Sequence, residues 1–247
     1  MTVKNSLIKP FMLAVVGIFF LLPLHAQQNK HVIKVNVPGL FLTQVNPGVE
    51  IAVGEKLSLG LWVNWLPERG LGLVDNLLEA EDAGFIDDFS LGGVALTPEL
   101  RFYPGNKRPA PHGFFIGPYA TYASYGLKAP YEYTPSSSSE AITVQSRGFL
   151  DFYGGGFIIG NQWLIGEHFV IDLFGGLGII SANAGVSVKD DRLALVDFEE
   201  IRDELQEEID IDSENITFFA NNNKAGFRTS SVLLPHGRFG FSLGYSF

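Results

Sequence analysis

The sequence predicts an all-β protein, an eight-stranded antiparallel β-barrel that is closed, spans a membrane and carries one helical insertion in its last outer loop. Three observations predict this fold. Strand-length segments alternate apolar residues with small or polar ones. The chain has 28 glycines and 13% aromatic residues but only 18% charged residues. After residue 26, no apolar run is long enough for a membrane-spanning helix.

The N-terminal 26 residues predict a cleaved secretory signal peptide. Lys4 and Lys9 precede the apolar run from Phe11 to Leu24, and we expect cleavage after Ala26. Residues 27–247 then form the barrel domain. The chain has no cysteine, which excludes a lipoprotein anchor, a disulfide scaffold and a thiolate metal site. The net charge of −10 argues against nucleic acid as a partner.

Eight segments with the alternation of strands follow in order. Pro98 and Pro118 fall inside two of them, and each implies a bulge or a lost ladder hydrogen bond. Asn46-Pro47-Gly48 predicts a tight turn after the first segment. The predicted strands are 32–42, 49–53, 57–65, 94–103, 114–126, 148–160, 169–179 and 232–247.

The connections alternate in length along the chain, except that the first one at the long-loop end, Asn46-Pro47-Gly48, is short. An acidic loop at about 67–90, a serine-rich loop at 129–145 and a long insertion at 184–231 lie at one predicted end. The connections at the other end are short turns. Long loops at one rim and short turns at the other are typical of outer-membrane barrels. A soluble β-sandwich has no reason to separate its loops in this way.

Pointing the apolar faces toward lipid encloses a set of charged residues. Three bases nearly balance three acids, and unpaired charge in a dry interior would be very costly. Eight strands leave an interior only wide enough for side chains. The sequence therefore predicts a plugged, salt-bridged lumen formed by Lys34, Glu50, Glu99, Arg101, Asp172 and Arg238.

The last strand has one large apolar face and one face of small or polar residues. This alternating aromatic strand, ending in phenylalanine, resembles the terminal strand of bacterial outer-membrane β-barrels. The resemblance implies the outer membrane of a Gram-negative bacterium and recognition by the barrel-insertion machinery. The residues of this insertion signal are Phe239, Phe241, Leu243, Tyr245 and Phe247.

Three further motifs resemble the small eight-stranded barrels of the outer-membrane-protein-A and -X type, most of which are uncharacterised. These motifs are Lys34-Val35-Asn36, the segment 46–50 and the segment 98–103. The resemblance implies that Glu99 and Arg101 lie in the luminal network. The chain departs from the larger members because no peptidoglycan-binding domain follows the barrel, which weakens a role in tethering the cell wall.

The insertion at 184–231 predicts one helix. Asp197 and Glu200 have the spacing of a capping box, and an apolar stripe follows at 198, 201, 205 and 209. Asp210, Asp212 and Glu214 alternate and offer hard oxygen ligands for Ca²⁺. The glycine and the distal glutamate of an EF-hand are missing, so solvated acids are the favoured interpretation.

These features predict a structural or surface-interaction role, such as adhesion or ligand binding through the acidic outer loops. The expected partners are outer-membrane lipids, lipopolysaccharide, the insertion machinery and an extracellular ligand, and no cofactor or enzymatic activity is expected. One alternative is a lipid-modifying enzyme with His236 and Ser230 or Ser231 at the outer rim. The sequence also leaves open a small-solute pore and a soluble lipocalin-like binding barrel.

Overall fold

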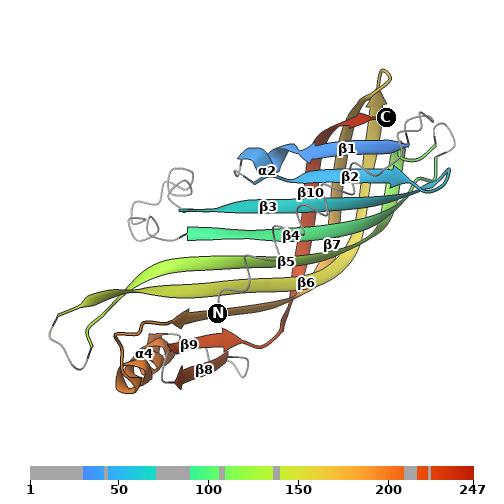
Figure 1. Ribbon diagram of the computed structural model, residues 1–247. Helices are drawn as coiled ribbons and strands as arrows, with labels where there is room; N and C mark the ends of the chain where they lie inside the picture. Colours follow the sequence, from blue (N-terminus) through green and yellow to red (C-terminus); the bar gives the residue numbers. More distant parts are fainter. Residues whose placement is uncertain are drawn as a thin grey trace.

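Eight strands form an antiparallel ring, as the sequence predicts (Figure 1). The computed structural model describes residues 30–41, 44–70, 90–105, 109–135, 140–208, 216–221 and 224–247. The predicted signal peptide, most of the acidic loop and the predicted Ca²⁺ ligands lie outside these ranges. The ring is complete because β10 pairs with both β1 and β7. Its strands are β1 (His31–Asn36), β2 (Pro47–Ala52), β3 (Leu57–Gly70), β4 (Ser90–Phe102), β5 (Gly113–Tyr133), β6 (Ile142–Ile165), β7 (Phe169–Val188) and β10 (Val232–Ser246).

The first strand is shorter than predicted. It ends at Asn36, and the short helix α2 (Val37–Phe41) follows. Pro38 explains the change, because proline fits the first turn of a helix but would remove a hydrogen bond from a continuing strand. Pro47 and Gly48 begin β2 instead of forming the predicted turn.

Three strands continue beyond the ring, where two shorter strands extend the same sheet. β5, β6 and β7 have 21, 24 and 20 residues, whereas β1 and β2 have 6 each. The far end of β7 pairs with β9 (Lys224–Thr229), which pairs in turn with β8 (Ile216–Asn221). The predicted insertion therefore contains two strands in addition to the predicted helix. We call the sheet formed by 129–133, 142–150, 185–188, β8 and β9 the outer extension.

The predicted helix is present as α4 (Leu195–Glu208) and lies against the outer extension (Figure 1). It begins two residues earlier than the predicted cap. Asp197 therefore lies inside the first turn, where its Oδ2 accepts a hydrogen bond from the backbone N–H of Ala194 at 2.7 Å. The buried residues at this contact are Tyr133, Val144, Val188, Leu193, Phe198, Ile201 and Ala225.

Arg192 holds the connection between β7 and α4. Its guanidinium donates to both carboxylate oxygens of Asp190, at 2.9 and 2.7 Å, and to the carbonyl oxygen of Thr143 on β6 at 3.1 Å. The hydrogen bonds from Arg192 lower the pKa of Asp190 from 3.8 to about 2. This contact fixes the position from which α4 starts.

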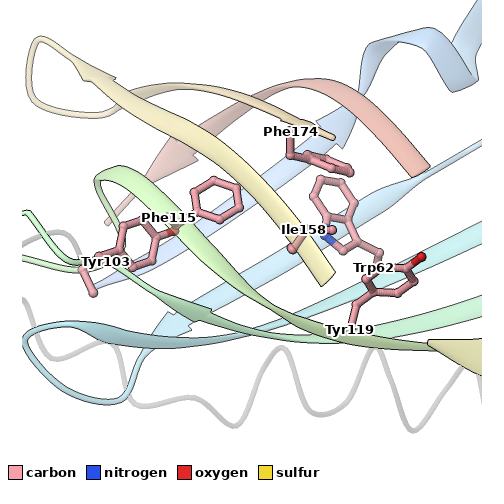
Figure 2. Close-up of a cluster of buried hydrophobic side chains, with 7 residues drawn as sticks. Trp62, Tyr103, Phe115, Tyr119, Ile158 and Phe174 are labelled. Atoms are coloured by element: carbon pink, nitrogen blue, oxygen red, sulfur yellow. The ribbon is translucent and has the colours of Figure 1, made fainter. Parts of the chain in front are cut away.

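Aromatic side chains fill the middle of the ring (Figure 2). Glycines on neighbouring strands make room for them. A Cβ at Gly48 would lie 2.5 Å from the Trp62 ring, and a Cβ at Gly240 would lie 2.5 Å from the Phe174 ring. The enclosed cluster contains Trp62, Tyr103, Ala110, Phe115, Tyr119, Ile158 and Phe174.

The outward face of the ring is apolar. Large apolar residues at alternate positions are exposed on every strand of the ring but β2, including Leu177 and Phe239, each 78% exposed. Charged residues on the inward face, such as Lys34, Arg101 and Asp172, are buried instead. None of the helices that the structure describes is long and apolar enough to cross a membrane.

Candidate functional site

The interior of the ring holds a network of buried charges. Lys34 of β1 lies at its centre and is 1% exposed. Its Nζ donates to Glu50 Oε2 on β2 at 2.6 Å, to Asp172 Oδ2 on β7 at 2.7 Å and to Gln162 Oε1 on β6 at 2.7 Å. One ammonium group with three donors is therefore fully used by three strands.

Arg101 of β4 is the second buried cation. Its Nη1 donates to Asp172 Oδ2 at 2.8 Å, and its Nε donates to Glu99 Oε2 at 2.7 Å. The guanidinium carbon lies 4.1 Å from the centre of the Phe115 ring and 5.7 Å from that of Phe174. Cation–π contacts of this kind strengthen when they are shielded from water. Arg101 thus connects β4 to β7 across the interior.

Arg238 of β10 completes the charge balance. Its guanidinium forms an ion pair with Glu99 and lies over the rings of Phe174 at 4.7 Å and Tyr119 at 5.4 Å. Glu99 therefore receives a cation from each side, since Arg101 contacts its other oxygen. The network extends in this way to the last strand of the ring.

The network is electrically balanced and rich in neutral hydrogen-bond partners. Tyr103 donates its hydroxyl to Glu50 Oε1 at 2.5 Å, and Ser58 donates to the same oxygen. A buried carboxylate needs such partners because its desolvation is costly. The three cations are Lys34, Arg101 and Arg238, and the three anions are Glu50, Glu99 and Asp172.

This arrangement is better suited to stabilising the fold than to reacting with a substrate. Every carboxylate in the network contacts at least one cation, so none is left as a free base. Within the described ranges, no group of three or more His, Cys, Asp or Glu side chains could hold a metal ion. The ion pairs of the network join five of the eight ring strands, β1, β2, β4, β7 and β10.

The structure brings together all six residues that the sequence analysis assigned to the lumen. Sequence reasoning missed Gln162, which bridges Lys34 and the carbonyl oxygen of Pro111. The sixth predicted strand ended at residue 160, two residues too early to include it. Continuing the alternation from Ile158 by four residues would have placed Gln162 on the inward face.

The predicted insertion signal lies on β10 and just beyond it. Phe239, Phe241, Leu243 and Tyr245 are exposed on the outward face of the strand. Phe247 follows the strand, and its ring centre lies 5.7 Å from that of His31. The apolar side of β10 is thus continuous with the outward apolar face of the ring.

The structure does not bring His236 to the serines proposed as its catalytic partners. The His236 ring faces the interior, 6.2 Å from the Tyr119 ring and 6.4 Å from the Phe152 ring. Ser231 lies on the opposite face and donates to Asn183 Oδ1 at 3.0 Å. Ser230 is separated from His236 by six residues of extended chain, roughly 20 Å. The structure therefore places neither of these two serines beside His236.

Comparison with known proteins identifies one family. Residues 12–187, more than half of the chain, match the family described as Protein of unknown function (DUF3575). The match covers β1 to β7 and ends before α4. No curated protein and no solved structure matches the chain.

Proposed function

We propose that this chain, which belongs to the DUF3575 family, is a transmembrane β-barrel of the outer membrane of a Gram-negative bacterium, similar to the outer-membrane-protein-A and -X type. The observation that carries the proposal is that the ring exposes its apolar residues and buries its charged ones, the reverse of a water-soluble protein. Large apolar residues are exposed on the outside of the ring, while Lys34, Glu50, Arg101 and Asp172 are buried within it. Lipid makes this arrangement favourable, whereas water would penalise the outer face.

The height of the apolar face supports this proposal. On β6 the outward apolar residues run from Tyr153 to Ile165, which are 12 residues apart. At about 3.3 Å per residue and a tilt of roughly 40°, this span is roughly 30 Å along the ring axis. That value is close to the thickness of the hydrocarbon core of a bilayer.

The filled interior supports a structural or surface-interaction role rather than transport. Aromatic rings and paired charges occupy the space between the strands, in agreement with the size of an eight-stranded barrel. A soluble lipocalin-like barrel would have the opposite arrangement, with charges outside and apolar residues inside. We assign His236 no catalytic role, because the structure places neither Ser230 nor Ser231 beside it.

The outer extension supplies a surface for interaction outside the membrane. Helix α4 exposes an acidic face that includes Glu199, Glu200 and Asp203. We place this end outside the cell, with the short turns and the insertion signal of β10 on the periplasmic side. Outer-membrane lipids, lipopolysaccharide and an extracellular ligand are the partners that this orientation implies.

The location is tested by fractionating expressing cells and by comparing gel migration of the protein with and without boiling. We expect the protein in the outer-membrane fraction and a band that shifts on heating, because ion pairs and backbone ladders inside lipid resist detergent. An unshifted band in the soluble periplasmic fraction would overturn the proposal and support the lipocalin-like barrel.

The plugged interior predicts that the purified protein does not conduct ions. In planar lipid bilayers we expect no single-channel steps at protein densities where a porin of known conductance gives many. The physical reason is that the Lys34 and Arg101 contacts cross the interior, and eight strands enclose only enough room for side chains. Reproducible conductance steps from the folded protein would contradict this prediction and favour the small-solute pore.

A further inference from the structure

A pocket lies on the outer extension and shares no lining residue with the luminal network. Its volume is about 460 Å³, within the range of small-molecule sites. It lies between β6, β7 and the β8–β9 hairpin. Phe149 and Phe219 supply aromatic walls, Lys224 and Arg228 supply cations, and Thr217 supplies a hydroxyl group.

The pocket lies on the same face of the sheet as the apolar surface of the ring. Phe149 lies four residues from Tyr153 on β6, so the two side chains point to the same, outward side of the strand. Arg228 pairs with Gly185 on β7, which in turn pairs with Phe149. Helix α4 packs on the opposite face, against residues such as Val144 and Val188. The pocket is therefore accessible from the side that faces lipid.

The pocket lies at the outer edge of the headgroup layer of a membrane. Phe149 lies four residues beyond Tyr153, where the outward apolar residues of β6 give way to Asp151. Four residues correspond to roughly 13 Å along a strand and roughly 10 Å along the ring axis. The polar headgroup region extends about 5–8 Å beyond the hydrocarbon core on each side. The pocket begins where lipid headgroups end.

The two cations of the pocket have no anionic partner in the described part of the chain. Among the residues that the structure describes, no ion pair forms at Lys224 or Arg228, and the Nζ of Lys224 lies 5.3 Å from the centre of the Phe219 ring. None of the lining residues is acidic. Lys224 and Arg228 thus lie together on β9 with no acidic lining residue beside them. They are suited to bind a phosphate group.

We infer that this pocket binds a phosphorylated sugar, namely the phosphate-bearing sugar headgroup of lipopolysaccharide in the same membrane. The aromatic walls provide flat apolar surfaces for the C–H faces of a sugar ring, and Lys224 and Arg228 bind its phosphate. Thr217 is available to a sugar hydroxyl. The inference deepens the proposed function and rests on it for the membrane source of the ligand.

The test is calorimetric titration of the full protein, folded in a neutral detergent, with diphosphoryl lipid A. We expect saturable binding by the natural chain and at least tenfold weaker binding by the double variant Lys224→Gln/Arg228→Gln. The exchanged pair Lys224→Arg/Arg228→Lys retains both charges and should bind within about threefold of the natural chain. The matched control, Lys30→Gln/Arg202→Gln, removes two cations that lie outside the pocket and should leave binding unchanged.

Two further ligands separate the sources of the sugar phosphate. Lipid A from which both phosphates have been removed should bind at least tenfold more weakly, because the cations then lose their partner. Glucosamine 6-phosphate tests a soluble source, and binding as tight as that of lipid A would assign the pocket to a free sugar phosphate. Binding of that compound more than tenfold weaker than lipid A would assign the pocket to the lipid.

The inference is overturned if the Lys224→Gln/Arg228→Gln variant binds lipid A as well as the natural chain, or if the dephosphorylated lipid binds equally well. Its failure can be distinguished from failure of the proposed function. A heat-modifiable outer-membrane protein without lipid A binding would overturn only the pocket assignment. A soluble periplasmic protein whose Lys224 and Arg228 bind glucosamine 6-phosphate would retain the phosphosugar site and overturn the membrane location.

Discussion

Replacing Arg101 with methionine is expected to lower the free energy of unfolding by about 3–5 kcal/mol, the usual cost of breaking a buried ion pair by removing one partner. Arg101 is fully buried and contacts Glu99, Asp172 and Glu50. Without it, three carboxylates would share the two cations that remain. The change is measured by urea unfolding of the protein in phospholipid vesicles, followed by tryptophan fluorescence.

Two companion variants make this measurement decisive. Arg202→Met removes the same charge from α4, where Arg202 pairs with the exposed Asp203, and should cost no more than about 0.5 kcal/mol. The double variant Arg101→Met/Asp172→Asn restores neutrality inside the ring and should cost less than the sum of its single changes. If Arg101→Met were as mild as Arg202→Met, the buried network would not stabilise the fold.

The ring could be predicted from the sequence because the physics of its strands is local. An alternation of large apolar and small or polar residues fixes which side chains face inward, and the order of short and long connections fixes the topology. The outer extension could not be predicted in the same way. In β8, the adjacent residues Phe218 and Phe219 point to opposite faces of the sheet, and both are partly buried. Helix α4 packs on one of these faces, and Phe219 lines the pocket on the other. Such a two-sided strand has no period of two.

The members of the luminal network could be predicted, but their contacts could not. Inward parity alone selects Lys34, Glu50 and Asp172. Which of them meet depends on the register between strands, such as the pairing of Gln162 with Asp172. Register is set by hydrogen bonds among segments far apart in the chain, so a single sequence does not reveal it. For the same reason the position of His236 relative to Ser231 required the structure.

Replacing Leu173 with arginine is expected to destabilise the protein in phospholipid vesicles by about 2–4 kcal/mol, the cost of a basic residue at the midplane on the lipid face of a barrel. Leu173 is 51% exposed and lies on β7 between Phe169 and Leu177, near the middle of the outward apolar face. An equally exposed leucine on a water-soluble protein would tolerate the change within about 0.5 kcal/mol. Urea unfolding in vesicles separates the two cases.

Val196→Arg is the matched control for this comparison. Val196 is an apolar residue of α4 that is 49% exposed, almost the same as Leu173, but α4 lies on the outer extension beyond the proposed membrane. Exposure in the structure is thus held constant while the surrounding solvent differs. A large cost at Leu173 with little cost at Val196 would mean that lipid surrounds the ring. Equal tolerance at both positions would mean that water does, and the apolar outer face would then need a protein partner to cover it.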